Sequence, residues 1–219
     1  MQSISKFVSL LVLFLKILYN LIKLAFNPNN LYPLLKIGNL LDKMKFYEVI
    51  LNKIKLDPQA LKLIHEKYMK QIPTMNELEK YPVDTLGYSY WLHMSKNNLS
   101  FYPRTFMIDT ESKYLRERQR HIHDILHTVF DLGIDQVSEI KINAIMFGNG
   151  AAPISVIVVA IGLLHFIFKN PENFLNLSDQ VFAGYSIGKS SKSVFAFKWE
   201  EMLDLNIYDV RQMLILKTL

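Results

Sequence analysis

The chain has 219 residues, a formal net charge of +5 and no cysteine. This length is enough for one domain with a sizeable core, and an apolar content of 50% excludes an intrinsically disordered chain. Because cysteine is absent, the sequence excludes disulfides, thiolate-ligated zinc, iron–sulfur clusters and a cysteine nucleophile. The modest charge forms no basic stripe, which argues against a nucleic-acid binder. Only eight glycines and eight prolines occur, so we predict an all-α, single multi-helix domain.

The first predicted element is an amphipathic helix over residues 7–26. At about 100° per residue, the polar side chains of this segment fall within roughly 60° of one another: Ser5, Ser9, Lys16, Asn20, Lys23 and Asn27. Residues 1–41 contain four lysines and no acidic residue, which favours an anionic membrane surface. Lys16, near the middle of the run, disfavours a transmembrane span. We predict a helix lying in the membrane interface; the alternative is a core helix with one solvated face.

A targeting signal is the weaker alternative for the same segment, although its lack of acidic residues would allow a mitochondrial presequence. Its apolar run continues past Lys16 without a small-residue cleavage site, which disfavours a secretory signal, and its lack of arginine argues against a mitochondrial presequence. We therefore expect residues 1–27 to form the amphipathic helix and residues 28–219 to form the helical domain.

Seven further helices are predicted along the chain. Asn27-Pro28-Asn29-Asn30 breaks the first helix, and residues 71–84 form a connection with two prolines. Asp57 is expected to cap a helix that starts at Pro58. Residues 153–168 are almost wholly apolar but short for a membrane span, which indicates a buried central helix. The predicted helices span approximately residues 34–56, 58–69, 85–96, 110–130, 135–147, 153–168 and 198–219.

Candidate ligands for a metal are concentrated in the segment His123-Asp-Ile-Leu-His127. Histidines four residues apart on a helix place two imidazoles on one face, at the spacing that chelates one ion. Asp124 lies about 100° round from His123 and can reach the same site. A tight turn at Gly133 would bring the next helix back with Glu139 opposite His127. These four residues, His123, Asp124, His127 and Glu139, are the predicted metal ligands; the alternative is a histidine pair that binds nothing.

Two imidazoles with one or two carboxylates suit a divalent metal of the zinc, ferrous iron or manganese type. Zinc is the first expectation, and magnesium is the least natural because it prefers oxygen ligands.

Two arginines share the face of the motif histidines. Arg116, Arg120, His123 and His127 recur at helical spacing, which is also common on a solvated charged face. Beside a metal, the arginines would suit a ligand with a carboxylate or phosphate. Arg116 and Arg120 are therefore, with Asp124, the candidate catalytic residues.

Three other histidines are predicted to have structural roles. His65 lies in a lysine-rich helix and is expected at the surface. His93 follows an aromatic stretch and is expected to be a hydrogen-bonded core residue. His165 lies in the apolar segment 153–168 and is expected to be a satisfied core histidine.

The spacing His-Asp-x-x-His, eleven residues, Glu resembles the signature of the ubiquinone (coenzyme Q) biosynthesis protein four family. The resemblance extends over about residues 81–210 and includes Thr85-Leu86-Gly87-Tyr88, Tyr114, Arg118, Arg120, Pro153 and Trp199-Glu200. The sequence departs from the family pattern where Asp131 and Ser138 replace glycines and Asn143 replaces a lysine.

This resemblance implies an intracellular peripheral membrane protein of a quinone-biosynthesis assembly, on the cytoplasmic face in a bacterium or at the mitochondrial inner membrane in a eukaryote. It implies metal-dependent oxidative decarboxylation of a polyprenylated hydroxybenzoate, with Arg120 on the carboxylate and the prenyl tail between segments 7–26 and 153–168. The implied partners are a prenyl lipid or prenylated quinone precursor, the membrane surface and other quinone-biosynthesis proteins, and a homodimer stays open.

Two other functions stay open at the level of sequence. The first is a non-catalytic lipid-binding scaffold, which the three departures from the family pattern favour. The second is a metal-dependent hydrolase that acts on a prenyl phosphate.

Overall fold

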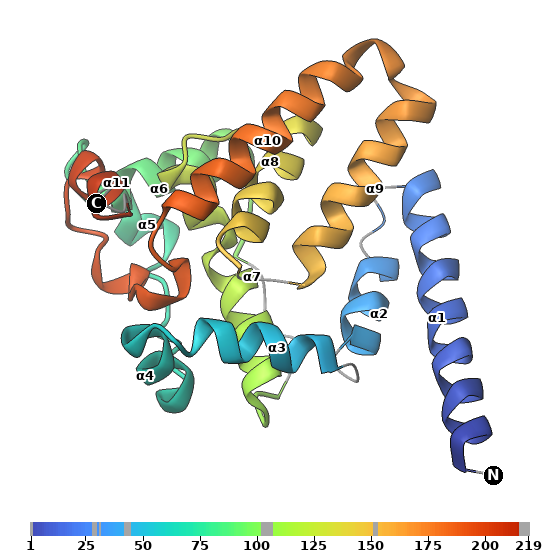
Figure 1. Cartoon of the computed structure of the whole chain (residues 1–219). Helices are drawn as coiled ribbons and strands as arrows, with labels where there is room; N and C mark the ends of the chain where they lie inside the picture. Colours follow the sequence, from blue (N-terminus) through green and yellow to red (C-terminus); the bar gives the residue numbers. More distant parts are fainter. Residues whose placement is uncertain are drawn as a thin grey trace.

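The protein folds almost entirely into α-helices (Figure 1). The computed structural model describes residues 2–27, 30, 32–41, 45–101, 107–150 and 153–214. Within these ranges there are eleven α-helices and no strand, which confirms the predicted all-α class. Three 3₁₀ turns also occur, at Pro171–Asn173, Val194–Ala196 and Trp199–Glu201. The α-helices are α1 Gln2–Phe26, α2 Tyr32–Leu41, α3 Lys45–Ile54, α4 Pro58–Glu66, α5 Met75–Leu78, α6 Leu86–Lys96, α7 Glu111–Val129, α8 Gln136–Gly148, α9 Pro153–Lys169, α10 Phe174–Ser190 and α11 Ile207–Leu214.

Side-chain caps set the start of four helices close to where the sequence predicts them. Asp57 accepts hydrogen bonds from the backbone N–H groups of the first turn of α4, and Asp135 does the same for α8. Thr85 caps α6 and Thr110 caps α7 through their hydroxyl oxygens. Each cap satisfies backbone donors that have no partner inside the helix.

Four expectations about the elements were wrong. The single helix expected over 34–56 is two helices, α2 and α3, with residues 42–44 outside the described part. A short helix, α5, lies inside the expected connection 71–84. The last helix begins at Ile207 instead of 198, and α10 was not predicted. Two of the expected break residues, Pro28 and Asn29, also lie outside the described residues.

Helix α7 contributes most of one side of the main hydrophobic core. It packs against α3, α4, α6 and α11, while α8 packs against both α9 and α10. Buried side chains of α7 and α8 belong to the same core cluster, among them Ile122, Ile125, Ile142 and Ile145. Helices α1 and α2 pack on α9 at one edge of the molecule, far from α11 (Figure 1). The core therefore fixes α7 and α8 relative to each other, and these two helices carry the predicted metal ligands.

Helix α9 is not the buried central helix that its sequence suggested. Val159, Ile161 and Phe166 are buried against neighbouring helices. Leu164 and Phe168 are exposed, the latter by 77%. The helix lies at the edge of the fold, because one of its sides contacts α8 and α10 and another contacts α1 and α2.

Helix α1 buries one narrow face and exposes a broad apolar one. Leu24 and Asn20 are buried, and Asn20 donates a hydrogen bond to the carbonyl of Lys16 at 2.7 Å. Ten large apolar residues of α1 are at least 40% exposed: Val8, Leu10, Leu11, Val12, Phe14, Leu15, Leu18, Tyr19, Ile22 and Phe26. A core helix with one solvated polar face does not match this pattern. Among the helices that the structure describes, none is long and apolar enough to cross a membrane.

Glycine allows α8 and α10 to pack with their backbones almost in contact. A Cβ atom at Gly188 would lie 1.9 Å from the carbonyl oxygen of Ile145, and one at Gly148 would lie 2.1 Å from that of Tyr185. Asn149 secures the same contact, because its amide donates to the carbonyls of Gly188 and Lys192 at 3.2 and 2.9 Å. The position of α8 therefore depends on small residues in α10.

We expect Gly188→Val to force α10 away from α8 and to lower the free energy of unfolding by about 1–3 kcal/mol. The matched control is Ala183→Val, which adds the same branched side chain at an exposed position of the same helix. Urea unfolding followed by circular dichroism measures both variants. Equal stability of the two variants would contradict the close contact.

A buried ion pair joins α7 to the C-terminal segment. Arg118 donates to both carboxylate oxygens of Glu200, and both side chains have no exposed surface. The same guanidinium donates to the carbonyl of Phe197 at 3.0 Å. His121 lies 2.9 Å from Glu200 and 3.0 Å from the carbonyl of Lys70. This network holds Trp199–Glu201 in a 3₁₀ turn and explains why the last helix starts only at Ile207.

The ion pair makes stability depend on pH in the acid range. Burial acts to raise the pKa of Glu200, but hydrogen bonds from His121 and Arg118 outweigh it and lower the pKa to about 2. A carboxyl whose pKa is lowered on folding stabilises the protein above its unfolded pKa, and this stabilisation is lost as the pH falls towards 2. We expect this group to account for a loss of about 3 kcal/mol between pH 5 and pH 2.

Urea unfolding of wild type, Glu200→Gln and Glu201→Gln between pH 6 and pH 2 tests this. Glu200→Gln should be less stable at pH 6, because Arg118 is left buried and unpaired, and its stability should change less on acidification. Glu201→Gln, at an exposed neighbouring position, should keep the pH dependence of wild type. A steep loss of unfolding free energy at acid pH in Glu200→Gln would show that other groups cause the pH dependence.

Candidate metal centre

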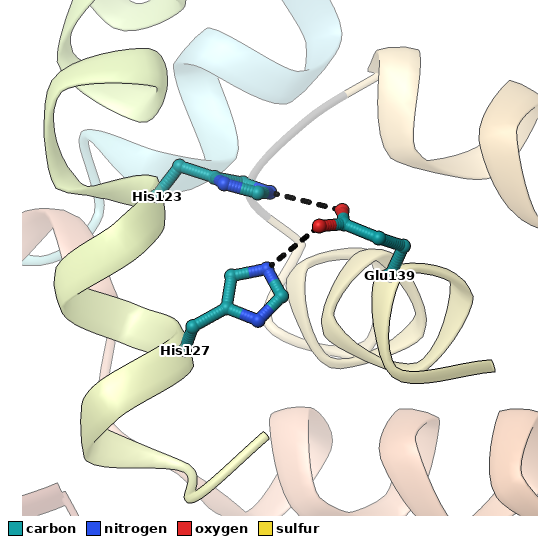
Figure 2. A group of neighbouring side chains, drawn as sticks. All are labelled: His123, His127 and Glu139. Atoms are coloured by element: carbon teal, nitrogen blue, oxygen red, sulfur yellow. Dashed lines mark ion pairs between the residues drawn. The ribbon is translucent and has the colours of Figure 1, made fainter. Parts of the chain in front are cut away.

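The structure brings three of the four predicted ligands together. His123 and His127 lie on consecutive turns of α7, and Glu139 lies in the first turn of α8; Figure 2 shows the three side chains pointing towards one another. Nε2 of His123 is 3.7 Å from Oε2 of Glu139, and Nε2 of His127 is 3.4 Å from Oε1. One potential ligand atom from each residue lies within 4.8 Å of the others. Two imidazoles and a carboxylate therefore face a common space.

The fourth predicted ligand, Asp124, lies behind His123. Its Oδ1 is 3.2 Å from Nδ1 of His123, while Nε2 of the same ring faces Glu139. A carboxylate on the far nitrogen of a ligating imidazole fixes the ring orientation and increases its basicity. In this geometry Asp124 orients His123 and leaves its Nε2 free to coordinate.

The end of α7 is built so that the chain turns back towards the histidines. The amide of Leu132 donates to the carbonyl of His127 at 2.9 Å, and the amide of Asp131 donates to that of Thr128 at 3.3 Å. This pair of bonds is a Schellman motif, which requires a left-handed residue after the helix. Asp131 has φ of 55° and supplies it. The expected turn residue, Gly133, was the wrong one.

His127 is the member of the site whose environment demands a ligand. Its side chain is only 1% exposed. Within the described part of the chain neither ring nitrogen makes a hydrogen bond, and the Glu139 oxygen at 3.4 Å is the ion-pair contact of Nε2. Burial of an imidazole without hydrogen bonds is costly. A divalent cation between His127, His123 and Glu139 would satisfy this nitrogen, so the residues present fit a metal ion.

The local charges favour a cation at this point. Burial acts to lower the pKa of His123, but a hydrogen bond to Asp124 and the charge of Glu139 outweigh it and raise the pKa. Burial acts to raise the pKa of Asp124, and the hydrogen bond to His123 and the neighbouring imidazoles lower it. The carboxylates of Asp124 and Glu139, which stabilise positive charge on His123, would also stabilise the positive charge of a metal ion bound to that ring.

The two candidate arginines differ in their surroundings. Arg116 is 8% exposed and packs against Gly38 of α2. Arg120 is partly buried and its guanidinium lies 3.1 Å from a carboxylate oxygen of Glu117, one turn away. Both stand on α7 within two turns of His123. The sequence did not single out Glu117, whose carboxylate would compete with that of a ligand for Arg120.

Sequence reasoning missed two histidines near this site. His121 was given no role, yet it hydrogen-bonds Glu200 in the buried network described above. His93 was expected to be a hydrogen-bonded core residue, but its Nε2 is buried without a hydrogen-bond partner. Its ring stacks on that of His127, with 5.6 Å between the centroids. The packing of α6 against α7 brings these two rings together, so the spacing of residues in the sequence could not have revealed their contact.

Comparison with known proteins decides the family. The profile of the coenzyme Q (ubiquinone) biosynthesis protein Coq4 family matches residues 11–219. The chain belongs to the Coq4 family. His123, His127 and Glu139, which converge in Figure 2, are the candidate metal ligands of this Coq4-family chain.

Individual relatives agree with this assignment. The chain is 33% identical over 140 residues to the mitochondrial ubiquinone biosynthesis protein COQ4 homologue of Plasmodium knowlesi. This alignment covers 58% of this chain and 39% of the relative. It is 24% identical over 194 residues to the mitochondrial ubiquinone biosynthesis protein COQ4 of Saccharomyces cerevisiae, in an alignment that covers 85% of this chain and 57% of the relative. The Coq4-family chain thus spans about half the length of these curated relatives.

A solved structure shares the fold. The crystal structure of a Nostoc punctiforme protein assigned to ubiquinone biosynthesis superposes with a TM-score of 0.83 at 25% identity. The superposition covers 93% of this chain and 98% of the Nostoc chain. The helical arrangement around the metal centre is therefore that of a Coq4-family protein.

The left-handed turn gives a prediction about the departure at Asp131. Asp131→Gly should raise the free energy of unfolding by about 0.5–1 kcal/mol, because glycine adopts positive φ without steric cost. Asp131→Val should lower it by about 1–2 kcal/mol, because a β-branched residue is strained there. Thermal or urea unfolding of the two variants checks the order, and a valine variant as stable as wild type would refute this account of the turn.

Proposed function

We propose that this Coq4-family protein holds one divalent metal ion between His123, His127 and Glu139, with Asp124 orienting His123. The single observation that carries this proposal is the buried His127 ring, whose nitrogens lack hydrogen bonds beside a carboxylate and a second imidazole. Two imidazoles and a carboxylate suit zinc, and they also suit ferrous iron and manganese. Magnesium prefers more oxygen ligands than this site offers.

We propose further that the ligand is a polyprenylated hydroxybenzoate, a precursor of coenzyme Q. The role of the relatives in ubiquinone biosynthesis supports the class of ligand. Arg116 and Arg120, on the helix that carries the histidines, would bind its ring carboxylate. For Arg120 this requires the carboxylate to share or displace Glu117.

The proposed position is peripheral, on the membrane face where a prenyl tail is available. Ten exposed apolar residues of α1 and the exposed Leu164 and Phe168 of α9 support this, because α1 and α9 pack together. Lys16 and Lys23 are exposed on α1 and would meet anionic headgroups. The mitochondrial relatives favour the mitochondrial inner membrane for this chain.

The proposed reaction is oxidative decarboxylation of the ring. A bound metal would supply Lewis acidity towards oxygen atoms of the ligand. With dioxygen and an external two-electron donor, the bond from the ring to the carboxylate carbon breaks, carbon dioxide leaves, one oxygen atom forms the new hydroxyl and the other forms water. The arginines would hold the carboxylate, and the apolar helices would exclude water from the tail.

A non-catalytic lipid-binding scaffold for quinone-biosynthesis proteins is the second candidate. The engagement of Arg120 by Glu117 favours it, because a paired arginine is less available to orient a carboxylate for reaction. The scaffold predicts bound prenyl lipid without release of carbon dioxide. The enzyme predicts release that is lost in His127→Ala.

Native mass spectrometry and elemental analysis of protein purified in mild detergent test the site. We expect one zinc or iron ion per chain together with a prenyl lipid, and at least about tenfold weaker metal retention in His123→Ala/His127→Ala. His65→Ala, a change at an exposed histidine of α4, is the matched control and should retain the metal. Lipid without metal in wild type would support the scaffold alone. Absence of both lipid and metal in wild type would refute both functions.

A further inference from the structure

His93 is a half-buried imidazole with a buried Nε2, and the Coq4 signature and the proposed function leave it without a role. It stands near the end of α6, a helix outside the α7–α8 pair that carries the signature residues. Its Nε2 is shielded from solvent and has no hydrogen-bond partner among the described residues. A nitrogen in this state destabilises the fold unless a ligand occupies it.

The surroundings of His93 belong to the metal centre. Its ring stacks on the ring of His127 at an interplanar angle of 26° and a centroid separation of 5.6 Å. The charges of Asp124 and Glu139 and both motif histidines act on it electrostatically. Two adjacent imidazoles, His93 and His127, therefore both carry buried nitrogens without hydrogen bonds on one side of the same site. One cation would satisfy both.

We propose that His93 is a third imidazole ligand of the metal centre, through its Nε2. This inference rests on the proposed metal site and extends its ligand set to three histidines and one carboxylate. Among the described residues the converging group consists of His123, His127 and Glu139, so the His93 ring must turn from its stacked position to coordinate. No hydrogen bond holds Nε2 against this rotation.

The backbone that carries His93 is held firmly, so only the side chain has to move. At the start of α6, the amides of Leu86 and Gly87 donate to the carbonyls of Leu205 and Leu203 at 2.9 and 2.7 Å. At its end, the side-chain amide of Asn97 donates to the carbonyl of His93 at 2.8 Å. A ligand placed on a rigid element loses little freedom when it binds.

A third imidazole has a consequence for the metal. Nitrogen-rich sets favour zinc, iron and copper over magnesium and calcium, which require oxygen ligands. With three histidines, the centre should therefore discriminate against magnesium more strongly than a site with two histidines does.

Pulsed electron paramagnetic resonance of the Cu²⁺-loaded full chain tests this, because it counts the imidazoles bound to the ion. We expect three in wild type and two in His93→Phe, which keeps an aromatic ring on His127 and removes the nitrogens. We also expect Cu²⁺ and Zn²⁺ to bind His93→Phe about tenfold more weakly. His65→Phe, at an exposed position on α4, should show three imidazoles and unchanged affinity.

The outcomes separate this inference from the proposed function. Stoichiometric Cu²⁺ with two imidazoles in wild type would overturn the role of His93 and leave the His123–His127–Glu139 site standing. Absence of stoichiometric Cu²⁺ binding in wild type would overturn both. The wild-type count does not depend on whether a variant folds, and circular dichroism of His93→Phe establishes that its own count refers to a folded protein.

Discussion

A polar helix passes through an apolar core, and each of its buried polar groups must find a partner. Helix α7 buries charged and amide side chains that would destabilise the fold if they were left unpaired. Arg118 is matched by Glu200 and by the carbonyl of Phe197. Gln119 donates to Ser155 of α9 at 3.3 Å. These partners come from distant parts of the chain, so pairing them also closes the fold around α7.

His127 differs from these paired side chains, because both nitrogens of its ring are buried without a hydrogen-bond partner among the described residues. Its side chain is nearly as deeply buried as that of Arg118, with 1% of its surface exposed. Glu139 approaches from α8, and His93 approaches from α6. Residues of three helices therefore gather around the buried nitrogens of His127, where the proposed cation would lie.

The candidate metal site and the apolar edge of the molecule are connected by helix packing. Helix α8 carries Glu139 and contacts α9, and α9 contacts α1, which exposes most of its apolar surface (Figure 1). A ligand with a polar head and a long apolar tail matches this order of elements. Gly188 contributes to this arrangement, because it allows the close approach of α10 that sets the position of α8.

The sequence by itself determined the helical class, most helix starts and the convergence of His123, His127 and Glu139. These depend on local rules: caps such as Asp57 and Asp135 act within one turn, and the His123–His127 spacing fixes two imidazoles on one helix face. Tertiary structure decided the rest. It placed Asp124 behind His123, made Asp131 the left-handed residue of the turn, and delayed the last helix until after the Arg118–Glu200 pair. It also brought His93 onto His127, because contacts between residues far apart in the chain arise only when helices pack.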